Sequence, residues 1–253
     1  MVSVYQVYQT LKSLVNKEQK GFITPQVFNN FAAMAQMNLY NEMFTDLIEA
    51  KKISRQNFDP GRDKSLKKQK EEDLSLYLKS VVLENQGFNV GLATDNSSVD
   101  FQKPSDLSKI VSVELGDGSS FLESRVNCEL IYNPDDISRI VGSNLSSPTA
   151  DFPVAFVVGD RIEVIPDSNQ TVILTYYAKP TSINSQGEID PNPPLYAFRT
   201  FNSESFFDFD NSRDFMLPAH YLGEVVMEMA KLIGVRLRES QVTAFAIKEE
   251  ASE

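Results

Sequence analysis

The stretch FMLPAHYLGEVVMEMAKLIGV, residues 215–235, returns the chain to helix after a long β-rich region, and this return decides the fold class. Its apolar residues recur every three or four positions, which is the spacing of one helix face. Pro218 suits the start of this helix, because a proline there sacrifices no hydrogen bond. The apolar positions are Leu222, Val225, Val226, Met229, Leu232 and Ile233.

The first eighty residues have the same helical periodicity. Residues 2–18 predict one helix. A second helix begins with Thr24 as its N-cap and Pro25 at its first position. The basic stretch 51–70 is expected to be a polar loop that leads into a further helix near 74–78. The apolar positions of the first two helices are Val4, Val7, Leu11, Leu14, Val15, Phe28, Ala32, Ala35, Leu39, Met43 and Leu47.

From about residue 81 the sequence changes to short β-prone runs separated by turn signals. Gly116-Asp117-Gly118 and Gly159-Asp160 each separate two such runs and predict hairpins. Pro134, followed by Asp135 and Asp136, predicts a short helix, because acidic residues are favourable in a first helical turn.

The order helices, strands and then helix predicts an α+β protein. The N-terminal helices and the C-terminal helix are expected to pack as one helical bundle, with an antiparallel β-sandwich or barrel inserted between them. The predicted domains are an N-terminal helical region (1–83), a β-rich region (84–205) and a C-terminal helical region (206–253).

The formal net charge of −11 is unevenly spread. Residues 1–80 hold 12 Lys and Arg against 9 Asp and Glu, a net of +3, and residues 81–253 hold 12 against 26, a net of −14. Such negative charge disfavours stable binding along nucleic acid, where basic side chains must neutralise phosphates. No apolar run reaches the roughly 18 residues of a membrane span, and no signal peptide is recognised, so synthesis in a cytoplasm is expected.

The sequence carries few signs of chemistry. It has no GxxxxGK[ST] loop, no GxGxxG fingerprint and no HExxH helix. The single cysteine, Cys128, is expected to be a semi-buried strand residue, and the single histidine, His220, to lie on a helix surface or in packing. We therefore predict no catalytic, cofactor or metal site and no enzyme activity. A hydrolase that uses an unrecognised carboxylate pair remains an alternative.

Four oxygen-bearing residues at alternate positions resemble the start of a calcium loop. An EF-hand also needs glycine at loop position 6 and glutamate at position 12, where this chain has Arg213 and Ala219. We therefore interpret the segment as the lead-in to a helix, with phenylalanines buried on one side and aspartates solvated on the other. The four residues are Asp208, Asp210, Ser212 and Asp214.

Three stretches together resemble virion proteins of short-tailed, crAss-like phages. NKEQKGFITPQVFNNFAAMAQMNLY (16–40) resembles their N-terminal helical pair. FPVAFVVGDRIEVIP (152–166) with TVILTYYAKP (171–180) is similar to the strand pair of head-to-tail connector (tail-adaptor) proteins. DFMLPAHYLGEVVMEMAKLIGVRLRES (214–240) resembles their C-terminal helix. The resemblance does not extend to 51–70 or 84–110.

The resemblance implies a structural protein of the virion neck or tail, made in the host bacterial cytoplasm. It implies a homo-oligomeric ring, commonly of about twelve copies, that docks beneath the portal protein, contacts adjacent tail or ring proteins and lines the DNA channel. DNA would pass without sequence-specific binding, and no membrane is involved. Arg236 and Arg238 are candidate interface charges, with a solvated helix end as the alternative.

A different class of function also fits the sequence. A receptor- or glycan-binding tail component could combine a β module with a helical anchor. This alternative needs exposed aromatic side chains in the segment 181–210, and the absence of tryptophan counts against it.

Overall fold

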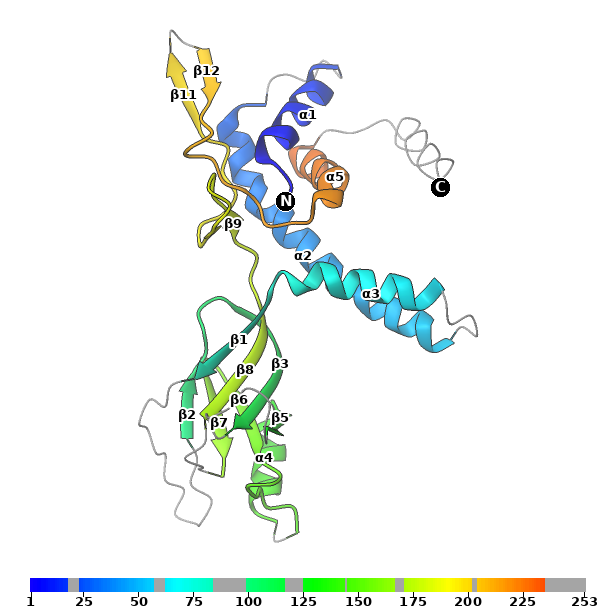
Figure 1. Ribbon diagram of the computed structural model, residues 1–253, viewed down its shortest axis with the longest axis vertical. Coiled ribbons are helices and arrows are strands. Elements are labelled where there is room, and N and C mark those ends of the chain that lie inside the picture. The colour runs from blue at the N-terminus through cyan, green and yellow to red at the C-terminus, as the bar shows by residue number, and fades with distance from the viewer. Residues whose placement is uncertain are drawn as a thin grey trace. The chain divides into compact units, whose positions relative to one another are not determined.

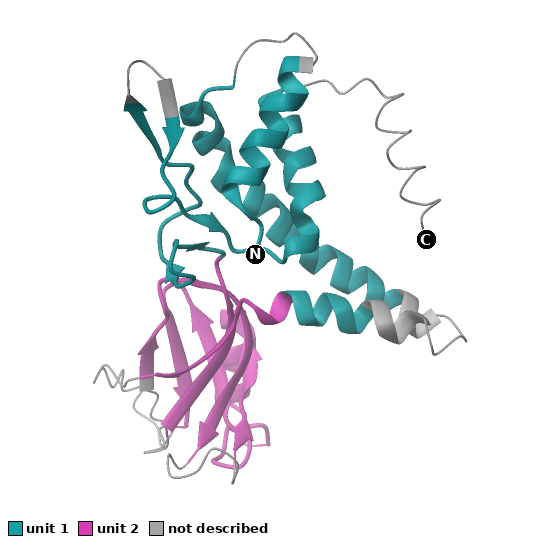
Figure 2. Cartoon of the chain, turned by 45° about the horizontal axis from the view of Figure 1, so that its top comes forward, with its two compact units in different colours: residues 1–73, 180–253 teal, residues 74–179 magenta. Residues whose placement is uncertain are grey.

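The computed structural model shows two compact units (Figure 2). Unit 1 comprises Met1–Asp73 and Pro180–Glu253, and unit 2 comprises Leu74–Lys179. The structure describes residues 1–17, 23–56, 62–83, 99–116, 125–143, 145–166, 171–201 and 204–234.

Unit 1 is built on a helical bundle drawn from both ends of the chain, as predicted. Helix α5 lies beside α1 and α2, and the predicted apolar stripe of α2 is buried (Figure 1). The Thr24 hydroxyl accepts the N–H of Val27 at 3.3 Å, which confirms the predicted N-cap. The helices are α1 (Val4–Lys17), α2 (Pro25–Gln56), α3 (Arg62–Ser75), η1 (Ala219–Tyr221) and α5 (Leu222–Ile233).

Short strands complete unit 1. Three of them form a small sheet in the order β10-β9-β13, and β11 and β12 form a two-stranded ribbon. Val2 makes an isolated antiparallel bridge to Phe215, so the first residues of the chain are hydrogen-bonded to the segment that precedes α5. The strands are β9 (Ser182–Ile183), β10 (Ile189–Asp190), β11 (Phe198–Phe201), β12 (Glu204–Phe207) and β13 (Asp214–Phe215).

Unit 2 contains two four-stranded sheets, in the orders β1-β8-β3-β4 and β2-β7-β6-β5. Both sheets contribute to one core, with Leu174 and Val113 from the first and Ile162 and Ala155 from the second, so the unit is a sandwich. The strands are β1 (Leu78–Leu83), β2 (Val99–Gln102), β3 (Leu107–Gly116), β4 (Val126–Asn127), β5 (Glu129–Ile131), β6 (Val154–Val158), β7 (Arg161–Ile165) and β8 (Thr171–Ala178).

The α+β class is confirmed, with two differences in the sheets. Within the described residues the sheets do not close into a barrel. The pair β5–β6 is parallel, not antiparallel. A parallel pair needs a crossover connection, and α4 (Pro134–Val141) lies in that connection. The predicted turn at Gly159 joins β6 to β7, with φ of +46° at the glycine.

The unit boundaries differ from the expected ones. They lie after Asp73 and Lys179, whereas the sequence had placed them after residues 83 and 205. The first difference arises because α3 ends at Ser75 and β1, which begins at Leu78, pairs along its length with β8. The second arises because β9 and β10 pair within unit 1.

Candidate functional site

The acidic segment that resembled a calcium loop is held together by its own chain. Asp208 is buried, with 8% of its surface exposed, and accepts hydrogen bonds from Arg199 at 2.6 and 3.1 Å and from Asn211 at 2.8 Å. The hydrogen bonds from Arg199 and Asn211 hold the pKa of Asp208 below its usual range. Phe206 and Phe209 are 51% and 62% exposed, so the predicted alternation of buried phenylalanine and solvated aspartate is wrong here.

Asp214 caps a helix, but a different one from the helix expected. Its carboxylate accepts the backbone N–H of Val4, the first residue of α1, at 2.8 Å. An N-terminal N–H of a helix has no partner within the helix, so this carboxylate supplies it from the far end of the chain. Among the described residues, no group of three or more His, Cys, Asp or Glu side chains is placed to hold a metal ion. The segment therefore fastens α1 to the chain that precedes α5.

A second polar cluster in unit 1 surrounds His220. The His220 Nε2 and the Tyr221 hydroxyl each lie 3.3 Å from the buried carboxylate of Asp73. Lys70 donates to Asp46 at 2.8 Å and to the Tyr221 hydroxyl at 3.4 Å. These contacts join α2, α3 and η1.

The electrostatics of this cluster favour a structural role. Burial alone would lower the pKa of Lys70, but the hydrogen bond to Asp46 and the interaction with Tyr221 raise it above its usual value. Burial raises the pKa of Tyr221 to about 12. Both groups therefore remain protonated donors near neutral pH, and the cluster links α3 to the helical bundle.

The other residues singled out from the sequence also have defined positions. Cys128 is buried between β4 and β5, and burial raises the pKa of its thiol to about 12, so the reactive thiolate is suppressed. Arg236 and Arg238 lie outside the described residues.

Among the described residues of unit 2, the most exposed large apolar side chains lie in and around the β5–β6 connection. We define residues 129–152 as the α4 segment. Leu145 is 97% exposed, Phe152 80% and Tyr132 61%. None of the residues of α4 is buried. The segment is acidic, with four Asp and Glu against one Arg. Sequence periodicity could not find this surface, because exposure depends on what the fold places over each side chain.

Unit 1 has an exposed face on α2, opposite its buried stripe. At about 3.6 residues per turn, the five side chains of this face project within an arc of about 100°. Leu39 and Met43, on the other side of the helix, are buried. We define the outer α2 face as Met34, Met37, Ile48, Lys51 and Lys52, all of which are exposed.

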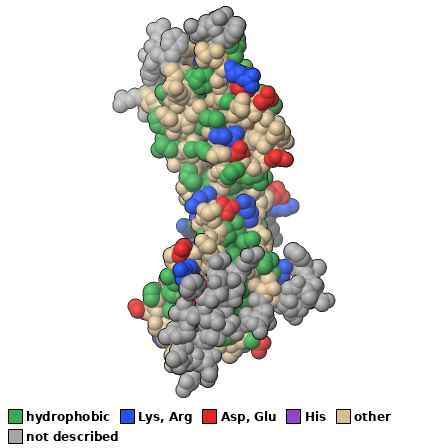
Figure 3. Space-filling view, turned by 90° about the vertical axis from the view of Figure 1, so that its left-hand side faces the viewer, with side chains coloured by type: hydrophobic (Ala, Val, Ile, Leu, Met, Phe, Trp, Pro, Cys, Tyr) green, Lys and Arg blue, Asp and Glu red, His purple; other side chains and the backbone are tan. Residues whose placement is uncertain are grey.

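Hydrophobic side chains reach the surface in other places too, and on the face drawn in Figure 3 they are interspersed with charged and polar ones. Single exposed apolar residues are ordinary in globular proteins, so only grouped ones indicate an interface. Among the described residues, no helix combines the length and the apolar character that a membrane span needs.

Comparison with known proteins leaves the family open. No protein-family model matches the chain, and no curated protein matches it.

Proposed function

We propose that this protein is a structural component of a phage virion, a head-to-tail connector that assembles as a ring beneath the portal protein and surrounds the path of the DNA. The observation that carries the proposal is the α4 segment. Two side chains as apolar as Leu145 and Phe152, 97% and 80% exposed in one connection, favour burial against another protein.

The rest of the chain is compatible with this role. A ring needs two different faces on each subunit. The outer α2 face carries Lys51 and Lys52, whereas the α4 segment has a net charge of −3, so these two exposed surfaces differ in charge. The net charge of −11 also suits a channel wall, because an acidic wall releases no counterions from DNA and does not hold it. The three stretches of sequence that resemble phage virion proteins, two of them connector proteins, support the assignment to phage.

The test is to mix the purified chain with the portal protein of the same phage and to image the mixture by negative-stain electron microscopy. Immunogold labelling of intact virions with an antibody to this chain provides a second readout. We expect rings stacked on the portal and label at the neck. Failure to bind the portal together with label elsewhere in the virion would refute the connector function.

One observation favours a second candidate, the receptor- or glycan-binding tail component. This alternative requires exposed aromatic side chains between residues 181 and 210, and Phe206 and Phe209 meet that requirement. Label at fibre tips, or binding to a host surface glycan that Phe206→Ala and Phe209→Ala abolish, would support this candidate over the connector.

A further inference from the structure

We propose that the α4 segment of one copy docks on the outer α2 face of a second copy, and that this is the contact that builds the ring. The inference rests on the proposed function for its biological meaning, but the contact itself can be tested without the portal.

Local hydrogen bonds form at several described positions of the α4 segment. The side chain of Asn133 caps α4 by accepting the N–H of Asp135 at 3.2 Å. The Ser143 hydroxyl accepts the backbone N–H of Leu145 at 3.3 Å. Thr149 and Phe152 exchange backbone hydrogen bonds of 3.0 and 3.3 Å. Local hydrogen bonds to the backbone of Leu145 and Phe152 therefore restrain this part of the chain, which lowers the conformational entropy lost on docking.

The outer α2 face offers three exposed apolar side chains and ends in positive charge. Met34, Met37 and Ile48 are exposed along the helix, and Lys51 and Lys52 follow Ile48 by three and four residues, which places them on the same side. The stretch 51–70 that contains these lysines holds eight Lys and Arg against two Asp, a net charge of +6. Methionine side chains adapt their shape readily, which suits a docking surface.

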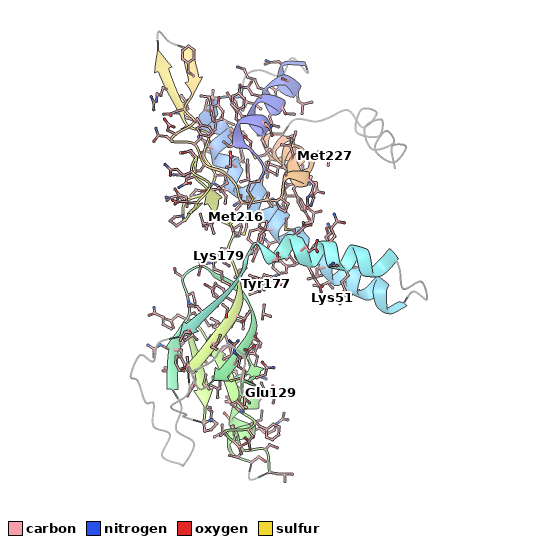
Figure 4. All side chains as sticks on the ribbon, viewed as in Figure 1. Lys51, Glu129, Tyr177, Lys179, Met216 and Met227 are labelled. Atoms are coloured by element: carbon pink, nitrogen blue, oxygen red, sulfur yellow. The ribbon has the colours of Figure 1, made fainter. Side chains whose placement is uncertain are left out.

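The α4 segment and the outer α2 face are complementary in charge, and both expose apolar side chains. The α4 segment has a net charge of −3, and Glu129 lies on its first strand while Lys51 lies near the end of α2 (Figure 4). Opposite charges steer and orient the encounter, and burial of Leu145 and Phe152 against the exposed apolar side chains of α2 supplies most of the affinity. Like charges placed opposite each other at this contact would weaken the association. Two α4 segments would repel each other, so a symmetric contact between like surfaces is disfavoured.

A contact between two different surfaces is heterologous, and after pairing one copy still has a free outer α2 face and the other a free α4 segment. Copies therefore add head to tail, and they form a ring where the rotation between neighbours closes. Identical surfaces would instead stop at a dimer. Growth beyond the dimer therefore distinguishes a head-to-tail contact from a symmetric one.

The experiment uses two variants of the full chain that each disable one surface. Leu145→Ala with Phe152→Ala removes the apolar side chains of the α4 segment. Lys51→Glu with Lys52→Glu reverses the charge of the outer α2 face. All four side chains are exposed, so folding is retained, as far-UV circular dichroism will verify. The matched controls are Met227→Ala on α5 and Lys12→Glu on α1, which change exposed side chains outside both surfaces.

Sedimentation velocity over chain concentrations up to about 1 mM, where even contacts of only about millimolar affinity are populated, measures the association. We expect the wild type and both controls to associate, and each double variant to associate at least about tenfold more weakly. An equimolar mixture of the two double variants should form heterodimers and nothing larger, because it contains one intact pair of surfaces.

Three results would overturn the proposed contact: a wild type that stays monomeric at about 1 mM, double variants that associate as the wild type does, or a mixture without heterodimers. The outcome is separable from that of the proposed function. Rings on the portal that survive both double variants would leave the connector function standing without this contact. Heterodimers combined with label away from the neck would leave the contact standing without the connector function.

Discussion

Replacing Asp214 by alanine tests whether its carboxylate stabilises the start of α1. The wild-type carboxylate accepts the N–H of Val4 at 2.8 Å, and alanine leaves that partly buried donor without its acceptor. Loss of an N-cap acceptor costs about 1 kcal/mol, with a range of about 0.5–2. The backbone bonds between Val2 and residues 215 and 217 do not involve the side chain, so they remain and keep the perturbation local. We expect the free energy of unfolding to fall by about 1–2 kcal/mol.

The measurement is urea unfolding followed by far-UV circular dichroism, with thermal unfolding as a second readout. For a chain of this size, 1 kcal/mol corresponds to a fall in Tm of about 2–4 °C. Asp210→Ala is the matched control, because Asp210 is exposed in the same segment. Asp214→Asn keeps an oxygen acceptor and should lose less stability than Asp214→Ala. If the free energies of unfolding of Asp214→Ala and the Asp210→Ala control differ by less than about 0.3 kcal/mol, the stabilising role of Asp214 is refuted.

Three further predictions concern unit 2 and helix α5. Burial alone would raise the pKa of Asp106, but its hydrogen bond from Lys79 at 2.6 Å helps to hold the pKa below the usual range. The stabilisation by ionised Asp106 is therefore present above the unfolded pKa of about 4 and is lost as pH falls through the folded pKa. Between pH 5 and 2 the Asp106→Asn variant should lose less stability than the wild type, as urea unfolding will measure. Gly159→Ala should lower the free energy of unfolding by about 1 kcal/mol, because φ at this glycine is +46°. Gly223→Ala should raise it by about 0.5–1 kcal/mol, because Gly223 lies in α5 and nothing lies within 4 Å of an added Cβ. Equal effects of the two substitutions in thermal unfolding would contradict both glycine predictions.

The helical bundle could be predicted from the sequence because its signal is local. The stripe from Phe28 to Leu47 repeats at the helical period, and Thr24 and Pro25 mark the start of the helix by their own chemistry. The structure confirms these positions as buried and Thr24 as the cap. The parallel pairing of β5 with β6 could not be predicted in this way. A strand of three residues carries no periodicity that distinguishes a parallel from an antiparallel partner.

The structural roles of Asp208 and Asp214 could not be predicted from the sequence, because they depend on residues distant in the chain. The sequence shows that Asp208 and Asp214 alternate with aromatic residues, but their partners come from elsewhere. Arg199 reaches Asp208 across the ribbon, and Val4 meets Asp214 from the opposite end of the chain. Spacing alone therefore could not distinguish a solvated carboxylate from a buried one. The segment was interpreted as the lead-in to the helix that follows it, because that helix is its neighbour in the sequence.

The insertion of unit 2 between the two halves of unit 1 sets a condition on folding. Closing a flexible loop of about 100 residues costs about 3 kcal/mol more than closing one of a few residues, from the scaling (3/2)RT ln n. The folded unit 2 brings its own ends together, because the N–H of Ala178 donates to the carbonyl of Tyr77 at 2.8 Å. Once unit 2 has folded, α5 and the segment around Asp214 therefore reach α1 and α2 across a short effective connection. Mutations that unfold unit 2 should consequently destabilise unit 1 as well, through the topology of the chain and without any need for contacts between the units.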